Sequence, residues 1–456
     1  MRIRIILSII LCRILRLLSR LLHRGGTAMP GRIALRIYPS LLAVLSKSVK
    51  VVAVTGTNGK TTSSRIIEEA FSEQKLSYFA NRSGANLLSG ITTEFVMNST
   101  LWGKAKKEYA IIECDEAAAV RVFPQLQPKV IVVTNLFRDQ LDRYGEVTHT
   151  LSNIRTAVST VPEATLCLNA DCSLTASLAN DLPNSVVYFG IEKDAVPSAE
   201  KPLISDATHC IRCKTEYIYH YITFGHLGGF ECPKCGYHRE KADYSVIKVL
   251  RQGADGSSIQ MSLRGQNIKA EVNLPALYNV YNAAGSIAAI MEMGFSADTA
   301  VNAVEKFQCG FGRMEKFNLG GGTRLMLAKN PAGCNQVLEF LKEVKNPFVL
   351  VLCLNDRSAD GTDISWIWDV DYEALPSFSD NLKEIIVSGD RAADMLLRIK
   401  YTGFPLEKIF EERNYEQLVQ KLSGYEDQIF IIPTYTAMLD LRKTLIRHCG
   451  GADFWE

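Results

Sequence analysis

The segment 54–62, Val-Thr-Gly-Thr-Asn-Gly-Lys-Thr-Thr, constrains what this chain can fold into more than any other stretch. It ends an apolar run and opens a segment with a helical pattern. In such a loop the backbone N–H groups point at phosphate oxygens, the Lys60 amine reaches the β- and γ-phosphates, and the Thr61 hydroxyl suits a Mg²⁺ ion. The pattern therefore predicts a strand, a loop that binds ATP, and a helix. The residues predicted to contact the nucleotide in this loop are Gly56, Thr57, Asn58, Gly59, Lys60, Thr61 and Thr62.

The loop is a shortened variant of the P-loop pattern. The full pattern places a glycine at position 54, where this chain has Val54. A glycine-rich turn that binds no phosphate is the alternative interpretation. The apolar run before the loop, the helical segment after it and the Lys60-Thr61 pair favour the phosphate-binding loop.

The composition is that of an ordinary globular protein. A chain of 456 residues with 47% hydrophobic and 22% charged residues can bury large cores and divide into two or three domains. The net charge of +2 argues against nucleic acid as a partner. Twelve cysteines without a cleavable signal, beside an ATP site, indicate the reducing cytoplasm, where thiols are free or bind metal.

The first 24 residues form a basic amphipathic segment. Arg2, Arg13, Arg16, Arg20 and Arg24 fall on one helical face among Ile and Leu. These arginines interrupt the apolar region, so we expect no secretory signal, and the apolar stretch is too short to span a membrane. Two interpretations stay open: a helix packed on the protein's own core, or a helix on the anionic inner face of the cell membrane.

Short β-rich runs alternate with longer helical patterns, which predicts mostly parallel α/β sheets. The Gly-rich stretch 309–313 separates two such series. We predict a helical segment at 1–48, a central ATP-binding domain at 49–312 with an insertion at about 200–242, and a Rossmann-like α/β domain at 313–456. The expected strands are 51–55, 109–113, 130–134, 165–168, 186–189, 348–354, 384–388 and 428–432.

Two acids lie at the C-terminal end of the predicted strand 109–113, in Tyr-Ala-Ile-Ile-Glu-Cys-Asp-Glu. Open α/β sheets hold their ligands at this end of their strands. A carboxylate there can bind Mg²⁺ beside the phosphates. Glu113 is a better candidate than Asp115 because it ends the strand; a solvated loop acid is the alternative.

Four cysteines form two C-x2-C motifs separated by eighteen residues, Cys210-Ile-Arg-Cys213 and Cys232-Pro-Lys-Cys235. Two such turns fit tetrahedral coordination of Zn²⁺ by thiolates. Four cysteine ligands leave no open position for water, so the predicted zinc site is structural. A chance cluster of unligated thiols is the alternative.

Two asparagines, Asn279 and Asn282, begin a predicted helix. Their amides can contact a purine edge or a ribose, although asparagine at a helix start is more often a cap.

Cys309 is the cysteine that invites interpretation as a nucleophile. It lacks the Gly-x-nucleophile-x-Gly elbow and a neighbouring histidine, so we interpret it as a linker or core thiol. The chain therefore carries no recognisable glutaminase of its own.

Five aspartates follow the predicted strand 348–354, beside two tryptophans. Carboxylates in a loop at a strand end can bind a metal, orient a histidine or cap turns, and the residues alone leave these interpretations open. The aspartates are Asp356, Asp360, Asp363, Asp369 and Asp371.

Taken together, these motifs resemble the Mur ligase family, in an order and spacing that extend over nearly the whole chain. The four-cysteine segment and Asp-Gly-Thr-Asp-Ile-Ser-Trp-Ile-Trp-Asp at 360–369 narrow the resemblance to a branch that works with a separate GatD-type glutaminase subunit. The segments that carry the resemblance are 56–61, Glu113, 134–142, 169–171, Asn279 with Asn282, Gly312-Arg313 and Lys329-Asn-Pro331.

The resemblance implies an ATP-dependent carbon–nitrogen ligase of cell-wall peptidoglycan biosynthesis. Such an enzyme amidates the α-carboxylate of D-glutamate in the stem peptide of lipid II, which gives D-isoglutamine. ATP first phosphorylates the carboxylate, and ammonia released from glutamine by the partner subunit then attacks the acyl phosphate.

The resemblance also implies the roles of particular residues. Lys60 and Glu113 are catalytic, and Thr61 and Glu113 hold Mg²⁺. Asp363 completes the catalytic triad of the glutaminase across the subunit interface by orienting a histidine of the partner. The nucleotide or its phosphates are contacted by Asn279, Asn282, Arg313, Lys329 and Asn330.

The chain departs from the family pattern at two places. Mur ligases show Asp-His-Leu-Asp-x-His where this chain has Asp-Gln-Leu-Asp-Arg-Tyr at 139–144, so we expect no second metal site there. Met326 stands where an acidic contact to the ribose is usual, hence the ribose must be held differently.

Two alternatives to amidation remain at this stage. One is a ligase of the same family that adds an amino acid, such as a folylpolyglutamate synthetase. The other is a non-catalytic, ATP-binding zinc scaffold that regulates a partner.

Overall fold

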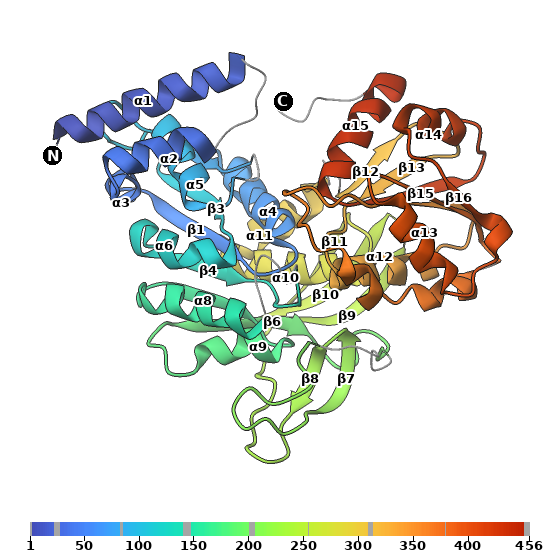
Figure 1. Cartoon of the computed structure of the whole chain (residues 1–456). Coiled ribbons are helices and arrows are strands. Elements are labelled where there is room, and N and C mark those ends of the chain that lie inside the picture. The colour runs from blue at the N-terminus through green and yellow to red at the C-terminus, as the bar shows by residue number, and fades with distance from the viewer. Residues whose placement is uncertain are drawn as a thin grey trace.

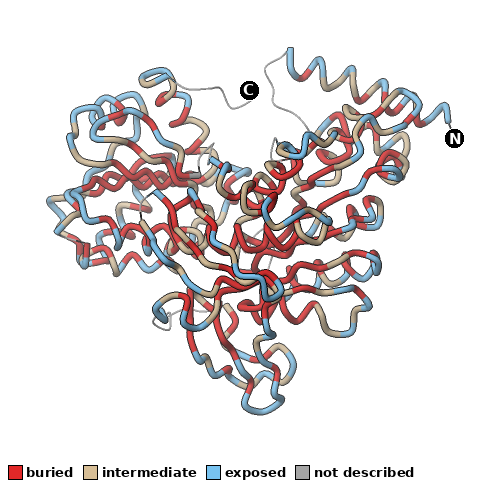
Figure 2. The backbone as a smooth tube through the Cα atoms, turned by 180° about the vertical axis from the view of Figure 1, so that it is seen from behind, coloured by how far each residue is buried: buried red, intermediate tan, exposed pale blue. Residues whose placement is uncertain are grey.

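The computed structural model describes residues 2–21, 28–82, 85–139, 147–199, 206–253, 255–308, 313–378 and 380–450. Two α/β units lie side by side, each built around its own sheet, and a hairpin projects from the first of them (Figure 1). Both sheets run through the buried interior, and exposed residues concentrate on the outer helices and loops (Figure 2).

The larger sheet is built from β1 (Lys50–Thr55), β2 (Tyr78–Ala80), β3 (Tyr109–Glu113), β4 (Val130–Val133), β5 (Thr165–Asn169), β6 (Val186–Ile191), β9 (Tyr244–Gly253), β10 (Gly256–Leu263) and β11 (Gln266–Val272). Its order is β11-β10-β9-β6-β5-β4-β1-β3-β2. The strands from β2 to β9 in this order pair in parallel, and β9, β10 and β11 form an antiparallel meander. Strand β1 is a continuous apolar run because helices cover both faces of this part of the sheet.

The chain reverses its direction of winding at β1. From β1 it crosses to β2 at the edge, returns to β3 beside β1, and then passes to β4 on the other side. The carboxyl ends of β4, β1 and β3 are therefore neighbours at a topological switch point, where open α/β sheets bind their ligands. The predicted phosphate loop follows β1 and Glu113 ends β3, so both lie at this edge.

Helices cover the larger sheet on both faces (Figure 1). One group packs together around α10, and α10 also contacts β4, β5, β6 and β9. This group consists of α4 (Lys60–Glu73), α10 (Leu277–Glu292) and α11 (Ala297–Lys306). The other elements are α6 (Glu116–Leu126), α8 (Val147–Ser159) and the short α9 (Ser173–Ala176), and α6 packs on α8.

The N-terminal helices pack at the β2 end of this unit. They are α1 (Arg2–Leu21), α2 (Ala28–Ile37) and α3 (Leu41–Ser46), and they contact α5 (Leu88–Met97) and α6. Helix α2 crosses α5 closely at Gly31, where a Cβ atom would lie 1.8 Å from the carbonyl oxygen of Ser89. Only glycine permits this approach.

The second sheet is built from β12 (Arg313–Phe317), β13 (Thr323–Met326), β14 (Phe348–Cys353), β15 (Leu382–Ser388), β16 (Ile409–Glu411) and β17 (Gln428–Pro433). Its order is β12-β13-β17-β14-β15-β16, and only β12 pairs antiparallel. Alternate residues of β14 enter different cores: Phe348 and Leu350 in one, Val349 and Val351 in the other. The helices around it are α12 (Pro331–Lys342), α13 (Ala392–Lys400), α14 (Tyr415–Leu422) and α15 (Tyr435–Cys449).

The insertion folds as a hairpin outside both sheets. It consists of β7 (Ile218–Phe224) and β8 (Leu227–Glu231), and its small core includes Tyr217, Phe230 and Tyr237. Tyr237 donates to the carbonyl oxygen of Ser173 at 2.7 Å, which ties this core to α9 of the first unit.

Candidate active site

Two glycines shape the loop between β1 and α4. Gly56 has φ 118° and Gly59 has φ 86°, both in the region that favours glycine. A Cβ on Gly56 would lie 2.4 Å from Oγ1 of Thr134, and a Cβ on Gly59 would lie 2.0 Å from Oδ1 of Asn282. The loop is thus pressed between the segment after β4 and helix α10, which brings Asn282 directly beside it.

The segment after β4 fixes the conformation of the loop. The Thr57 N–H donates to the carbonyl oxygen of Asn135 at 2.9 Å, and the Asn58 N–H donates to the side-chain oxygen of Asn135 at 3.1 Å. The Thr57 hydroxyl bonds both the N–H and the carbonyl oxygen of Phe137, each at 3.1 Å. These bonds fix the backbone of the loop against the segment after β4.

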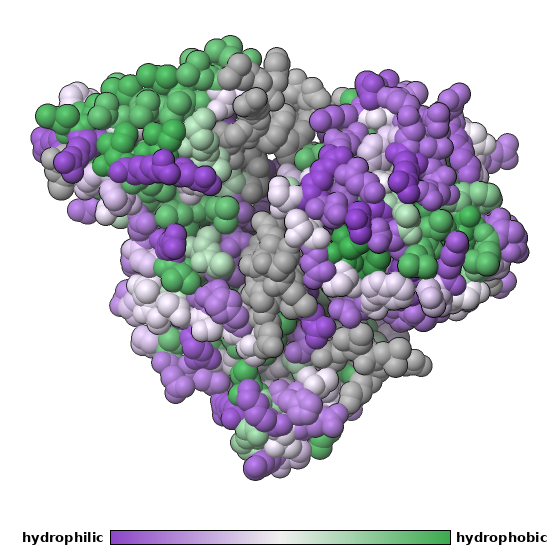
Figure 3. Space-filling model, viewed as in Figure 1, coloured by the Kyte–Doolittle hydropathy of each residue, from purple (hydrophilic) through white to green (hydrophobic). Residues whose placement is uncertain are grey.

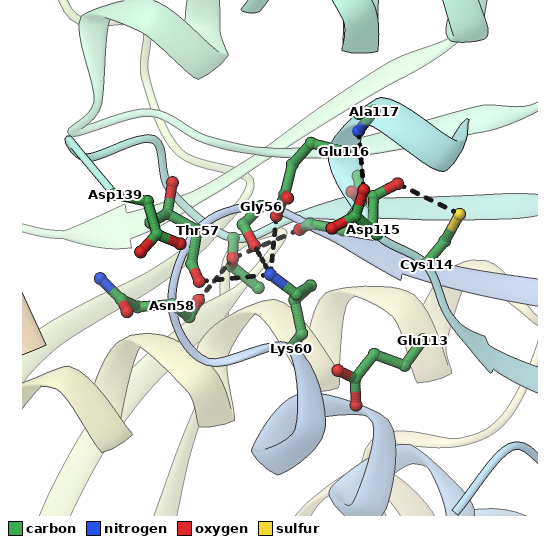
Figure 4. Close-up of polar contacts among 12 residues, drawn as sticks. Gly56, Thr57, Asn58, Lys60, Glu113, Cys114, Asp115, Glu116, Ala117 and Asp139 are labelled. Carbon is green, nitrogen blue, oxygen red and sulfur yellow. Dashed lines mark hydrogen bonds and ion pairs between the residues drawn. The ribbon is translucent and has the colours of Figure 1, made fainter. Parts of the chain in front are cut away.

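Lys60 begins α4 and is buried beneath the loop (Figure 4). Its Nζ donates to the carbonyl oxygens of Gly56 at 2.5 Å and Thr57 at 3.2 Å, and lies 2.7 Å from Oε1 of Glu116. Burial lowers the pKa of Lys60, but Glu116 and Glu113 more than offset it, so the pKa is raised and the amine keeps its charge.

Glu116 begins α6 and is also buried. Burial raises the pKa of its carboxyl group above the usual value, although Lys60 acts in the opposite direction. Burial thus dominates for Glu116 and the neighbouring carboxylates dominate for Lys60. We take the pair as charged, because a contact of 2.7 Å between a buried ammonium and a carboxylate is an ion-pair geometry.

Glu113 and Thr61 meet across the gap between β3 and α4. The Thr61 hydroxyl donates to Oε2 of Glu113 at 2.6 Å. Asn81 fixes the backbone of Glu113 by accepting from its N–H at 2.9 Å and donating to its carbonyl oxygen at 2.7 Å. Two hard oxygen donors this close fit neighbouring positions of an octahedral Mg²⁺ ion, whose ligands are about 2.9 Å apart.

A second group of contacts joins the two α/β units at the phosphate loop. Lys329 lies 3.0 Å from Oδ2 of Asp139, and the Asn330 side-chain amide donates to Asp139 at 3.2 Å and to Asn58 at 3.2 Å. Burial raises the pKa of Asp139, but Lys329, Lys60 and the hydrogen bond from Asn330 together outweigh this effect. The pKa is therefore below its usual value and the carboxylate stays ionised. Asn330 also caps α12 by accepting from the Gly333 N–H at 2.7 Å.

Replacing Asp139 with asparagine should lower the rate of ATP-dependent turnover about tenfold or more, because Lys329 would lose the carboxylate that holds it beside the phosphate loop. The steady-state rate at saturating ATP measures the effect. Asp255 offers the matched control: it also pairs across the two units, with Lys316 at 3.3 Å and Arg324 at 3.1 Å, but its side chain is 76% exposed. Equal losses for Asp139→Asn and Asp255→Asn would contradict the assignment.

A pocket opens between the two units next to the phosphate loop. Asn279 and Asn282 line it from α10, and Met326 lines it from the end of β13. The Asn279 side chain donates to the carbonyl oxygen of Pro275 at 2.7 Å and accepts from Asn282 at 3.1 Å, so both amides are held in fixed orientations. The remaining lining residues are Asn58, Gly59, Thr62, Asn135, Tyr278, Met314, Leu327, Gly333, Gln336 and Val337.

The four cysteines of the insertion converge. Their sulfur atoms all lie within 4.8 Å of one another, with Cys210 and Cys235 at 3.5 Å and Cys213 and Cys232 at 3.4 Å. Tetrahedral Zn²⁺–thiolate bonds place neighbouring sulfur atoms about 3.8 Å apart. Both C-x2-C turns also share one backbone form: the N–H of the residue after the second cysteine bonds the carbonyl oxygen of the first, at 2.9 and 3.0 Å. The cluster therefore fits a tetrahedral metal ion.

The hairpin contacts the phosphate loop through Phe137. The Phe137 ring packs on Phe224 and His226 at the hairpin tip, with ring centroids 5.9 and 4.4 Å apart, and the Phe137 backbone bonds Thr57.

The same end of the hairpin is tied to α10. Asp171 accepts from Arg239 at 2.6 Å and from the Tyr281 hydroxyl at 2.5 Å, and Tyr281 also bonds Thr223 of β7 at 2.6 Å. Tyr281 directly precedes Asn282 of the pocket. The cysteine-bearing insertion and the pocket therefore share one helix.

The aspartates after β14 have separate environments. Asp360 is buried and accepts from the Thr436 N–H at 2.7 Å at the start of α15. Asp356 lies 3.7 Å from Arg391, and Asp369 lies 3.5 Å from Arg138 of the first unit. Asp363 is half-buried in the loop, where one carboxylate oxygen accepts from the Ser365 N–H at 2.8 Å.

Several residues singled out from the sequence lie outside the described part of the chain. These are the side chain of Arg313, Arg24, Cys309 and the segment 140–144. Their predicted roles stay predictions.

Two family models match this chain: the Mur ligase middle domain over residues 54–231 and the MurT ligase C-terminal domain over residues 327–438. Subunit MurT of the lipid II isoglutaminyl synthase (glutamine-hydrolyzing) of Streptococcus pneumoniae is 35% identical over 430 residues, which make up 94% of this chain and 94% of that protein. This chain belongs to the MurT family of Mur ligases.

Solved structures show the Mur ligase fold, a mixed α/β architecture with parallel sheets. A pseudomurein peptide ligase type C from Methanothermus fervidus has a TM-score of 0.67 at 22% identity, over 88% of this chain and 79% of that one. A MurF ligase from Thermotoga maritima, solved in complex with ADP, has a TM-score of 0.62 at 13% identity, over 91% of this chain and 85% of that one. At these identities the likeness concerns the fold alone.

Sequence reasoning missed three polar residues that the structure places at the phosphate loop: Glu116, Asp139 and Asn135. Glu116 follows two residues after Cys114, in the acidic stretch that ends β3, and only its pairing with Lys60 distinguishes it from Asp115. Asp139 and Asn135 lie within the segment 134–142 that carried the resemblance. The sequence signal that could have identified Asp139 and Asn135 is their position after β4, at the same sheet edge as Glu113.

Proposed function

We propose that this chain is the synthetase subunit of a lipid II isoglutaminyl synthase. It amidates the α-carboxylate of D-glutamate in the stem peptide to D-isoglutamine, with ATP as the energy source. The observation that carries the proposal is the convergence of Lys60, Thr61 and Glu113 on one phosphate loop, in a chain of the MurT family.

The first step would activate the carboxylate, which is a poor acyl donor. A carboxylate oxygen attacks the γ-phosphorus of ATP, the bond to ADP breaks, and an acyl phosphate forms. Lys60 stabilises the negative charge that spreads over the moving phosphoryl group. Glu116 would hold the Lys60 amine at the start of α4 for this role. A Mg²⁺ ion held by Thr61 and Glu113 would supply further neutralisation.

The second step would form the amide. Ammonia attacks the acyl carbon, phosphate leaves, and a proton is lost. Water must be excluded, since it would hydrolyse the acyl phosphate and waste ATP. The contacts of Asp139 with Lys329 and Asn330 close the two units over this region and support such a role.

The partner would be a GatD-type glutaminase that docks on the C-terminal unit and delivers ammonia. Asp363 would complete its triad by orienting a histidine of that partner. The half-buried position of Asp363 in a surface loop, with one oxygen bonded to Ser365, is compatible with this role.

The nucleotide would lie in the pocket between the units. Asn279 and Asn282 would contact it from α10, Arg313 would contact it from β12, and Lys329 would approach its phosphates. We further infer domain limits of 49–312 and 313–456, a Rossmann-like C-terminal unit and a cytoplasmic location. The two separate sheets support the domain limits.

The proposal is tested with the chain purified together with a glutaminase subunit. ADP release and product mass are measured with a lipid-linked muropeptide, ATP and either ammonium or an amino acid. We expect an ammonium-dependent product in which one carboxyl group has become a carboxamide. We expect no amino-acid adduct. An amino-acid adduct instead would favour a folylpolyglutamate-type ligase, and no ADP release at all would favour a non-catalytic scaffold.

For the cysteine cluster we propose a structural Zn²⁺ ion. Elemental analysis should find one zinc per chain, and Cys213→Ser should lower that content and accelerate amide hydrogen exchange in the insertion at 206–239, because metal binding supplies folding energy to small metal-bound units. Cys449→Ser serves as the control, since Cys449 lies on α15 away from the cluster. Unchanged zinc content in Cys213→Ser would contradict the assignment.

A further inference from the structure

Helix α1 carries an exposed apolar stripe along its outer face. The residues recur at spacings of three and four, so they lie on one side of the helix. Their exposed fractions range from 38% for Ile10 to 81% for Ile3. Figure 3 shows the apolar surface gathered over α1. The stripe consists of Ile3, Leu7, Ile10, Ile14, Leu17, Leu18 and Leu21.

The opposite face of α1 is anchored to the protein and sets the rotation of the helix. Ile9 and Cys12 are fully buried in the main core. The Arg13 guanidinium donates to the carbonyl oxygens of Val96, at 3.2 Å, and Ser99 at the end of α5. Arg16 lies 3.9 Å from Glu94 of α5. Arg13 and Arg16, two of the five arginines on the predicted basic face, therefore make contacts within the protein. The leucines of the stripe face away from it.

The N-terminal segment that carries the stripe contains basic residues and no acidic ones. The first 50 residues contain ten Lys and Arg residues and no Asp or Glu, which leaves 41 basic and 49 acidic residues for the rest of the chain. Exposed arginines flank the stripe on α1 and continue onto α2. They are Arg2, Arg4, Arg20, Arg32 and Arg36.

The turn after α5 extends the apolar surface beside α1. Trp102 is 77% exposed and Leu101 is 44% exposed. The turn reaches α1 at Gly103, where a Cβ atom would lie 3.6 Å from Ile5. Exposed tryptophan beside basic residues is typical of surfaces that contact lipid headgroups.

The charge pattern decides between the two occupants that such a stripe could take. A second copy of the chain, paired through α1, would bring arginines of both copies together without the acidic partners that stabilise paired helices. An anionic lipid surface supplies phosphates for the arginines and an apolar layer for the stripe. None of the helices in the described ranges has the length and apolar content needed to cross a bilayer, so the helix would lie along the surface.

We propose that α1 binds the surface of an anionic phospholipid bilayer, with its apolar stripe in the headgroup–acyl boundary and its exposed arginines on lipid phosphates. The binding itself does not depend on the amidation proposed above. If that function holds, the helix keeps the ligase beside a lipid-linked substrate.

The test is flotation of the whole chain, with its glutaminase partner, on vesicles of phosphatidylglycerol and phosphatidylcholine. The variant Leu7→Ser/Ile14→Ser/Leu17→Ser should bind the vesicles with an affinity lowered about tenfold or more, because it removes apolar contact area from the stripe. Arg2→Gln/Arg4→Gln/Arg20→Gln should lose about fivefold per charge, and vesicles of phosphatidylcholine alone should reproduce that loss.

A matched control removes exposed apolar side chains elsewhere. Leu397, Tyr401 and Leu406 are 50%, 70% and 59% exposed in the C-terminal unit, against 52%, 48% and 61% for Leu7, Ile14 and Leu17. Their triple serine variant should float as the unchanged chain does. Equal flotation of the stripe variant would overturn the proposal, as would lipid-free self-association that the stripe variant abolishes, since the occupant would then be a second copy.

A separate measurement distinguishes this proposal from the proposed function. ADP release with a soluble muropeptide and ammonium should be unchanged in the stripe variant. Absence of that activity in every variant would refute the amidation, while the flotation result would still decide the membrane contact.

Discussion

Replacing Lys60 or Glu113 with alanine is expected to lower ADP release about 100-fold or more. Lys60 is the buried cation of the phosphate loop, and Glu113 holds the oxygen that meets Thr61 at 2.6 Å. In the proposed reaction both would stabilise charge that develops only as the phosphoryl group moves, so kcat should fall more than the affinity for ATP. Initial rates with the glutaminase partner, muropeptide and glutamine give the effect.

Two further variants keep this prediction falsifiable. Lys50 begins β1, the strand that precedes the loop, and its side chain is 54% exposed. Lys50→Ala should leave the rate unchanged. Lys60→Ala leaves Glu116 buried without its partner, which costs about 3–5 kcal/mol of stability. Lys60→Gln/Glu116→Gln removes both charges of the pair and should be better folded but equally slow. Full activity in a folded Glu113→Ala chain would refute the enzymatic role.

Asp363→Asn is expected to abolish product formation from glutamine, by on the order of 10⁴-fold, and to leave formation from ammonium largely intact. In the proposed triad an amide would not hold the partner's histidine in the required tautomer, whereas the ligase site would still receive free ammonia. The two rates are measured on the same complex, with glutamine or ammonium as the only nitrogen source.

Asp371 provides the control for this prediction, since it is an exposed acid of the same loop region. Asp371→Asn should keep both rates. Loss of both rates in Asp363→Asn would place Asp363 in the ligase site, and retention of both would remove it from the triad.

The strands predicted from the sequence are those buried on both faces. Continuous apolar runs such as β4 and β14 give a strong local signal, because parallel strands covered by helices have no polar face. The meander β9–β11 was not predicted. Strand β10 does alternate, with Ile259, Met261 and Leu263 buried, but its polar face obscures it among loop-like residues. The three-residue strands β2 and β16 carry too little pattern to identify.

In the site, too, the features that could be predicted are those whose residues are near one another in the sequence. The phosphate loop could be predicted because its residues are consecutive, and the cysteine cluster because its spacing reflects two turns. The pairing of Lys60 with Glu116 spans 56 residues, and that of Lys329 with Asp139 spans 190 residues. Such pairs depend on which strand ends become neighbours, and no local pattern encodes that.

Helix α10 contacts the insertion through Tyr281 and lines the pocket between the two units with Asn282, the next residue. Consecutive positions of a helix point about 100° apart, so a single helix contacts both places. If zinc holds the insertion together, the supply of zinc would affect the pocket that α10 lines. A cell starved of zinc would then amidate its wall more slowly even with ATP in excess.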